Sequence, residues 1–101
     1  MSEFVRVAGT ADVKPGNAMV AEINGKTLAV FNVDGTFHVI DNTCVHRGGP
    51  LGEGDVEGDV VSCPWHGWQY NVKTGACVNN PAAKVTAYEV KVEGDDIRIQ
   101  L

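Results

Sequence analysis

Short segments in which apolar and polar residues alternate, or in which β-branched residues gather, recur along the whole chain. None of them sustains the 3.6-residue period of an amphipathic helix, so the pattern predicts β-strands throughout. Two neighbouring pairs of segments are joined by Asn24-Gly25 and Asp34-Gly35, which tolerate the positive φ angles of a tight hairpin turn. We expect an all-β fold in which antiparallel hairpins close into a small sandwich or barrel. The predicted strands cover residues 4–7, 19–23, 27–33, 37–40, 60–63, 68–72, 85–92 and 97–101.

Three segments interrupt this pattern. Residues 44–59 contain five glycines and a proline, and they read as a loop with no strand in it. Residues 63–67 and 79–82 form two further irregular segments. Because such segments carry few large apolar side chains, they cannot bury themselves unaided. We expect the three loops to lie together at one end of the β scaffold.

The composition limits what the chain can be. A length of 101 residues fits a single domain, residues 1–101, with one core. The 13 acidic residues outnumber the 8 lysines and arginines, and the net charge of −5 argues against nucleic acid or an anionic membrane as partner. No segment is typical of a secretory signal or a membrane span, so we expect a cytoplasmic protein. Three cysteines cannot all pair within the chain, which favours metal ligands or free thiols.

Cysteine and histidine gather at one specific spacing. Cys44-Val45-His46 is followed, after sixteen residues, by Cys63-Pro64-Trp65-His66. Each segment offers one thiolate and one imidazole, which together match a [2Fe–2S] cluster with two histidines on one iron. A structural zinc site also takes two cysteines and two histidines, but it usually begins with two cysteines two to four residues apart. The spacing therefore favours the iron–sulfur cluster and leaves a zinc-binding module as an alternative.

The segments CVHRGGPL and CPWHGWQY resemble the two cluster-binding loops of the Rieske family. Residues 79–82 stand where that family has a third, proline-containing loop. The resemblance implies an all-β Rieske fold with a cluster-binding part at approximately residues 43–83, and it implies that the histidine-bound iron accepts the electron. The implied ligands of the one Rieske [2Fe–2S] cluster are Cys44, His46, Cys63 and His66.

Comparison with other branches of the family predicts a low reduction potential. Rieske proteins of the cytochrome bc-type complexes add a cysteine to each loop and join the pair in a disulfide. Gly49 and Trp65 stand at those positions here. Trp68 replaces a serine whose hydroxyl bonds a bridging sulfide in those proteins, whereas Tyr70 matches a tyrosine whose hydroxyl reaches a cysteine sulfur. Because hydrogen bonds to sulfur stabilise the added electron, losing one lowers the potential.

The function implied by the resemblance is one-electron transfer without catalysis. A terminal oxygenase needs a 2-His-1-carboxylate iron site, and only His38 remains once the ligands are assigned. A bc-type subunit is disfavoured because the disulfide and a membrane anchor are missing. What remains is similar to the soluble ferredoxins that carry electrons from a flavin-dependent ferredoxin reductase to a terminal oxygenase such as an aromatic-ring dioxygenase. Such a carrier docks transiently with both partners.

In one alternative the chain also binds the cluster but is a subunit of a permanent complex. The chain is also similar to the small Rieske subunit of a nitrite-reductase-like complex, and a permanent subunit would present a large apolar face.

Several single residues have a plain structural interpretation. Cys77 is expected to be a small buried hydrophobe and His38 an ordinary strand residue. For Trp65, docking and shielding of the cluster are both open. The acidic residues between 55 and 59 read as a solvated loop, with steering of a basic partner as the second interpretation.

Overall fold

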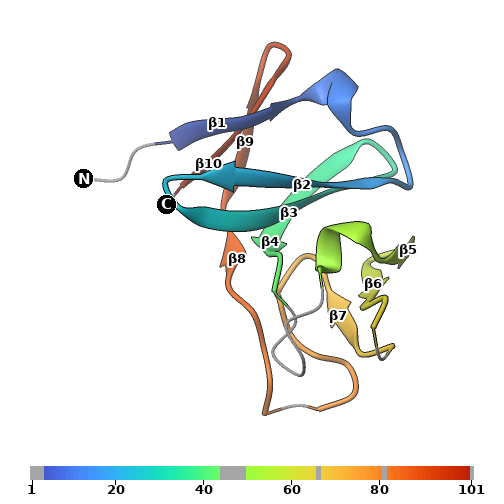
Figure 1. Ribbon diagram of the computed structural model, residues 1–101. Helices are drawn as coiled ribbons and strands as arrows, with labels where there is room; N and C mark the ends of the chain where they lie inside the picture. The colour runs from blue at the N-terminus through green and yellow to red at the C-terminus, as the bar shows by residue number, and fades with distance from the viewer. Residues whose placement is uncertain (1–3, 44–49, 66, 81, 101) are drawn as a thin grey trace.

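The computed structural model describes residues 4–43, 50–65, 67–80 and 82–100, and within them it confirms the all-β prediction. The strands form three antiparallel sheets (Figure 1). The first sheet has the order β1-β10-β9, built from β1 (Phe4–Gly9), β10 (Asp96–Gln100) and β9 (Val90–Glu93). The second has the order β2-β3-β4-β8, built from β2 (Ala18–Ile23), β3 (Lys26–Val33), β4 (Thr36–Asp41) and β8 (Ala87–Tyr88). The third has the order β5-β6-β7, built from β5 (Asp55–Glu57), β6 (Val60–Ser62) and β7 (Gln69–Asn71).

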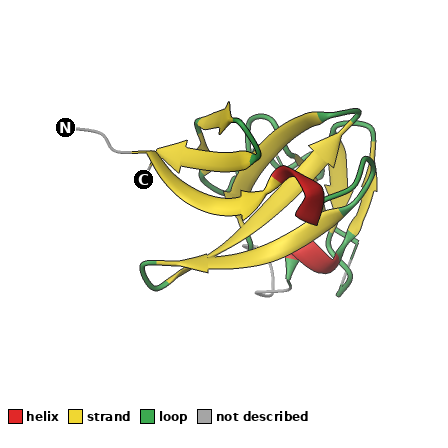
Figure 2. Ribbon diagram, turned by 90° about the horizontal axis from the view of Figure 1, so that it is seen from above, coloured by secondary structure: helices red, strands yellow, loops and turns green. Residues whose placement is uncertain are grey.

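Helical structure in the described residues is limited to two single 3₁₀ turns, drawn red in Figure 2. They are η1 (Thr10–Asp12) and η2 (Leu51–Glu53), and neither was predicted from the sequence. No helix in this part of the chain has the length and apolar character needed to cross a membrane.

Both predicted hairpin turns are present. Asn24 and Gly25 have φ angles of 51° and 79°, and they connect Ile23 to its cross-strand partner Lys26. Asp34 and Gly35 have φ angles of 51° and 90° and connect β3 to β4 in the same way. Two successive positive φ angles give the turn that matches the twist of the flanking strands. The two turns therefore fix the register of β2, β3 and β4.

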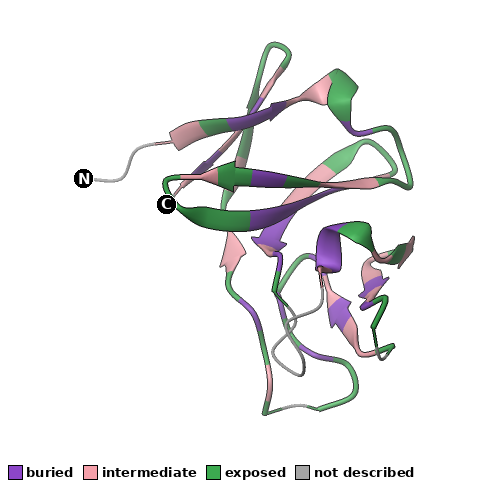
Figure 3. Ribbon diagram, in the orientation of Figure 1, coloured by how far each residue is buried: buried purple, intermediate pink, exposed green. Residues whose placement is uncertain are grey.

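The second sheet, β2-β3-β4-β8, is covered on both faces by the other two, and we call it the middle sheet. This covering explains the long apolar run in β3. Leu28 and Val30 pack toward the first sheet, while Ala29 and Phe31 pack toward the third, as the two-residue period of a strand requires. All four side chains are fully buried (Figure 3). The core is thus divided into two clusters by the middle sheet. We call the cluster beside the third sheet the loop-side core; it contains Ala29, Phe31, Ile40, Leu51, Val61, Cys63, Tyr70, Val72, Cys77 and Val85.

The prediction of a strand-free loop over residues 44–59 was wrong at β5. Asp55 and Glu57 are exposed, and Val56 between them packs against the loop-side core. Val56 pairs with Val61 of β6, so a single apolar side chain anchors this edge strand. The alternation was not recognised in the sequence because it covers only three residues and stands among glycines.

The predicted strand 85–92 is divided between two sheets. Ala87 and Tyr88 pair with β4, whereas Val90 to Glu93 pair with β10. The chain changes sheet at Glu89, whose carbonyl accepts a hydrogen bond of 3.1 Å from the Gln100 N–H. The sequence pattern did not predict this break, because both halves have the same strand-like composition.

Residues 75–78 form two isolated β-bridges and no continuous strand. Cys77 pairs with Tyr70, and Ala76 pairs with Lys84. The segment therefore contacts two different neighbours in place of one continuous strand.

A matched pair of glycine substitutions tests how closely the segment after β7 approaches Val85. Gly75 and Gly25 both have a φ of 79°, but a Cβ on Gly75 would collide with the Val85 carbonyl oxygen, whereas nothing lies within 4 Å of one on Gly25. Each alanine carries the left-handed strain, roughly 1 kcal/mol, and only Gly75→Ala adds overpacking. We expect Gly75→Ala to lower the free energy of unfolding by about 2 kcal/mol more than Gly25→Ala in urea titrations. Equal losses would show that this approach imposes no packing constraint.

Candidate functional site

Cys63 is the one predicted ligand that lies among the described residues; Cys44, His46 and His66 lie outside them. Cys63 follows β6, is 3% exposed and is a free thiol. Its N–H donates to the Trp68 carbonyl at 2.7 Å, and its own carbonyl accepts the Gly67 N–H at 2.9 Å. Gly67 has a φ of 74°, a conformation that glycine adopts without strain. The second ligand segment is thus a tight turn closed on itself by backbone hydrogen bonds.

The base of the first predicted loop is closed by pairing between the residues after β4 and those at the start of η2. Thr43 forms a β-bridge with Pro50, so the residues that flank the interval 44–49 lie side by side. The Asn42 carbonyl accepts the Leu51 N–H at 2.7 Å, and the Asn42 Oδ1 accepts the Gly52 N–H at 2.7 Å. Leu51 is fully buried in the loop-side core. The segment that leaves the middle sheet before Cys44 therefore returns to it directly after residue 49.

The third loop is attached to the second through β7. The Gln69 N–H donates to Asn79 Oδ1 at 2.6 Å, and the Gln69 carbonyl accepts the Val78 N–H at 2.7 Å. The loop is closed where the Cys77 N–H donates to the Ala83 carbonyl at 3.1 Å. Pro81 of this loop lies outside the described residues. The described flanks of the three predicted loops thus lie together at one end of the scaffold (Figure 1).

The donor chemistry of the described part fits a thiolate ligand at Cys63. Within the residues that the structure describes, no three histidine, cysteine, aspartate or glutamate side chains gather, so no competing metal site is present there. A buried free thiol in a turn that begins directly after a strand can present its sulfur to a soft metal such as iron. Cys77 is 4% exposed and packs in the loop-side core, which agrees with the expected role of a small hydrophobe.

The aromatic residues of the second segment divide into exposed and buried ones. Trp65 is 57% exposed, and its expected roles in docking and in shielding of the cluster both stay predictions. Trp68 packs against the loop-side core, and Tyr70 is fully buried within it. The hydrogen bond expected from Tyr70 to a cysteine sulfur stays a prediction.

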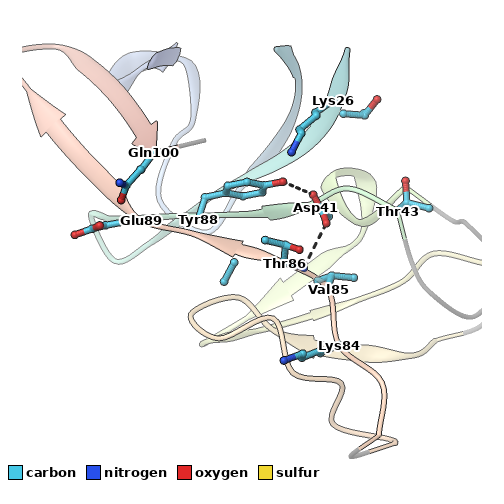
Figure 4. Close-up of a pocket in the computed structure, with 11 residues that line it drawn as sticks. Lys26, Asp41, Thr43, Lys84, Val85, Thr86, Tyr88, Glu89 and Gln100 are labelled. Atoms are coloured by element: carbon cyan, nitrogen blue, oxygen red, sulfur yellow. Dashed lines mark hydrogen bonds between the residues drawn. The ribbon is translucent and has the colours of Figure 1, made fainter. Parts of the chain in front are cut away.

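A polar groove of about 900 Å³ lies beside the base of the first loop (Figure 4). Asp41, at the end of β4, accepts the Tyr88 hydroxyl at 2.7 Å and the Thr86 N–H at 3.3 Å. The Asp41 N–H donates in turn to the Thr86 carbonyl at 3.0 Å. Burial, followed by the hydrogen bond to Asp41, raises the pKa of Tyr88 to about 12. The Asp41 carboxylate thereby attaches the segment after the third loop to the strand that leads into the first.

His38 is an ordinary strand residue, as predicted. It pairs with Phe31 across β3 and β4, and its Nε2 has no hydrogen-bond partner among the described residues. Burial and the nearby positive charge of Lys73 lower the pKa of His38, and Asp59 opposes them weakly. His38 is therefore a neutral imidazole at neutral pH.

The predicted acidic run is largely solvated. Asp55 and Glu57 are exposed on the edge strand β5. Asp59 forms an ion pair with Lys73, with 3.3 Å between Oδ2 and Nζ. Both partners are partly exposed, so the pair contributes little to stability.

Comparison with known proteins gives a consistent result over almost the whole chain. The family model described as the Rieske [2Fe–2S] domain matches residues 3–92. Ferredoxin CarAc of Metapseudomonas resinovorans is 32% identical over 98 residues, which cover 95% of this chain and 92% of that protein. A chain from the complex of reduced oxygenase and oxidized ferredoxin in carbazole 1,9a-dioxygenase superposes with a TM-score of 0.86 at 32% identity, covering 95% of this chain and 91% of that one.

A second kind of protein shares the fold alone. An NADH-dependent nitrite reductase small subunit of Mycobacterium tuberculosis superposes with a TM-score of 0.91, covering 100% of this chain and 96% of that one. Its identity is only 19%, so this likeness says nothing about function.

The Tyr88–Asp41 hydrogen bond predicts a specific loss of stability at high pH. The pKa of Tyr88 is about 12 in the folded chain and about 10 in the unfolded one, so the folded state holds the phenolic proton more tightly. The stabilisation is complete below pH 10 and disappears as the pH rises to about 12. We expect the wild type to melt at a higher temperature than Tyr88→Phe at pH 8, and the difference to vanish toward pH 12. A difference that does not change with pH would contradict the assignment.

Proposed function

Because the chain belongs to the Rieske [2Fe–2S] family and is a ferredoxin, we propose that Cys44, His46, Cys63 and His66 bind its single cluster. The observation that carries this ligand set is the position of Cys63, a buried free thiol in a closed turn beside the base of the first loop. Two thiolates and two neutral imidazoles are the donors of a Rieske centre. The bound cluster supplies a site that accepts and releases one electron at a time.

The protein residues around this site have supporting roles. Leu51, Tyr70 and Val61 are fully buried and keep water away from the Cys63 side of the centre. A dry surrounding strengthens electrostatic interactions with the bound group. The chain itself performs no bond-making chemistry and acts as the electron-transfer component, with residues 1–101 as one functional unit.

We further propose transient docking between a flavin-dependent ferredoxin reductase and a terminal oxygenase such as an aromatic-ring dioxygenase. A similar ferredoxin has been solved in complex with its oxygenase, which supports the second partner. Large exposed apolar side chains in the described residues are few and lie on different elements: Val20, Trp65, Val78 and Val92. A permanent subunit would need a continuous apolar face, so this distribution favours a carrier over the nitrite-reductase-like alternative.

The cytoplasm is the compartment that we propose for this carrier. Neither Cys63 nor Cys77 forms a disulfide, and cysteines without disulfides are typical of a reducing compartment.

A pair of cysteine variants tests the ligand set directly. Cys63 and Cys77 are 3% and 4% exposed and pack in the same core, so serine at either position carries a similar cost of burial. We expect the wild type and Cys77→Ser to contain iron and acid-labile sulfide and to give an electron paramagnetic resonance signal after reduction. We expect Cys63→Ser to contain neither. A cluster retained by Cys63→Ser, or zinc without sulfide in the wild type, would refute the proposal.

A low reduction potential is the second expected outcome. Trp68 packs against the loop-side core and brings no hydroxyl to the position where a serine would bond sulfide. Without that hydrogen bond the reduced cluster is stabilised less, so we expect a reversible one-electron couple at roughly −150 mV. Voltammetry of the purified protein measures it. A potential near +300 mV, the upper end of the Rieske range, would contradict the low-potential assignment.

A further inference from the structure

Two asparagines are the buried polar residues of the described chain, and they make the same kind of contact in different places. Asn32 is 3% exposed and Asn42 is 7% exposed. The Asn32 Oδ1 accepts the Gly35 N–H at 2.8 Å, and the Asn42 Oδ1 accepts the Gly52 N–H at 2.7 Å. A buried amide is costly unless it is hydrogen-bonded, so both side chains are held by definite partners. Asn32 serves a hairpin turn, whereas Asn42 lies two residues before Cys44.

Asn42 joins three elements at the base of the first loop. Its N–H donates to the Thr27 carbonyl of β3 at 3.1 Å, and its carbonyl accepts the Leu51 N–H at 2.7 Å. The Gly52 N–H reaches its side chain, so successive N–H groups of η2 bind one residue. Thr43, which follows Asn42, forms a β-bridge with Pro50, which precedes Leu51. The residues on both sides of the interval 44–49 are therefore attached to the middle sheet through Asn42.

The contact leaves no room for a side chain at position 52. A Cβ on Gly52 would lie 2.6 Å from Val20 Cγ2 and 2.9 Å from both Asn42 Oδ1 and the Met19 carbonyl oxygen. Contacts this short require glycine at position 52, because real Cβ atoms do not approach so closely. The backbone of η2 is thus seated directly on β2 and on Asn42, and its position is fixed from two sides.

We propose that Asn42 is a positioning residue for the cluster. By holding both ends of the first loop in one arrangement, it determines how the ligands of that loop meet those of the turn after β6. A ligand set drawn from two loops binds tightly only when the bases of both are fixed, because otherwise binding must also order the chain. This inference rests on the proposed function, since it takes Cys44 and His46 as ligands.

The comparison of Asn42→Ala with Asn32→Ala tests the proposal. Each variant removes a buried amide that accepts a glycine N–H, and Asn32→Ala also loses the hydrogen bond from Asn32 Nδ2 to the Val13 carbonyl at 2.8 Å, so both should melt at lower temperature and Asn32→Ala by at least as much as Asn42→Ala. Cluster release into an iron chelator, followed by the loss of visible absorbance, should be about tenfold faster in Asn42→Ala than in wild type. Asn32→Ala should release its cluster at the wild-type rate. Equal release from the two variants would overturn the proposal and leave Asn42 with a structural role only.

A conservative variant provides the rescue. Asn42→Asp keeps an oxygen acceptor for the Gly52 N–H at the same place, and we expect it to return the release rate close to the wild-type value. Release as fast as from Asn42→Ala would overturn the role of this hydrogen bond. Should Asn42→Ala fail to fold, Asn42→Ser and Asn32→Ser give the same comparison with a shorter acceptor.

The experiments distinguish an incorrect ligand set from an incorrect role of Asn42. Wild-type protein without iron and sulfide would overturn the proposed function, and this inference with it. Wild-type protein with a cluster, combined with equal release from the two asparagine variants, would overturn only the role of Asn42.

Discussion

Backbone hydrogen bonds at the bases of the three loops are the interaction on which the site depends. The loop sequences are rich in glycine and poor in large apolar side chains, so burial cannot hold them in place. The scaffold instead closes each base with specific pairs. Asn42 binds η2, the Cys63 N–H binds the Trp68 carbonyl, and the Cys77 N–H binds the Ala83 carbonyl. A small all-β chain can thus present irregular segments at one end without a second layer of protein around them.

The middle sheet provides these bases because both of its faces are covered. In β4 the side chains alternate between the two faces, and the alternation continues to the last residues before the first loop. Asp41 binds Tyr88 and the Thr86 N–H on one side, and Asn42 binds Gly52 on the other. Two consecutive residues therefore connect the first loop to the segments that follow the first and third loops. Because the middle sheet separates the two core clusters, its two faces can hold two different segments at this end of the molecule.

Sequence patterns revealed the features that depend on local chemistry. Asn24-Gly25 and Asp34-Gly35 specify their turns through φ angles alone, and the irregular segment that begins at Cys63 is a turn, as its composition predicts. The edge strand β5, the change of sheet at Glu89 and the part played by Asn42 were not predicted. Strand β5 is too short to show a period, and the other two features depend on contacts with a different element, Gln100 of β10 for Glu89 and Gly52 of η2 for Asn42, for which the pattern within one segment carries no signal.

An electron carrier must meet two opposed requirements, and the turn after β6 answers both within three residues. The bound centre needs a dry surrounding that fixes its potential, yet the electron needs a short path to the surface. Cys63 is 3% exposed and packs beside Val61 and Tyr70, whereas Trp65 is 57% exposed. The hydrogen bond from Gly67 to the Cys63 carbonyl makes the chain reverse between the buried and the exposed position. Because this reversal is backbone geometry and Gly67 supplies its positive φ, it places no demand on the exposed side chain at position 65, which is separated from the buried side chain of Cys63.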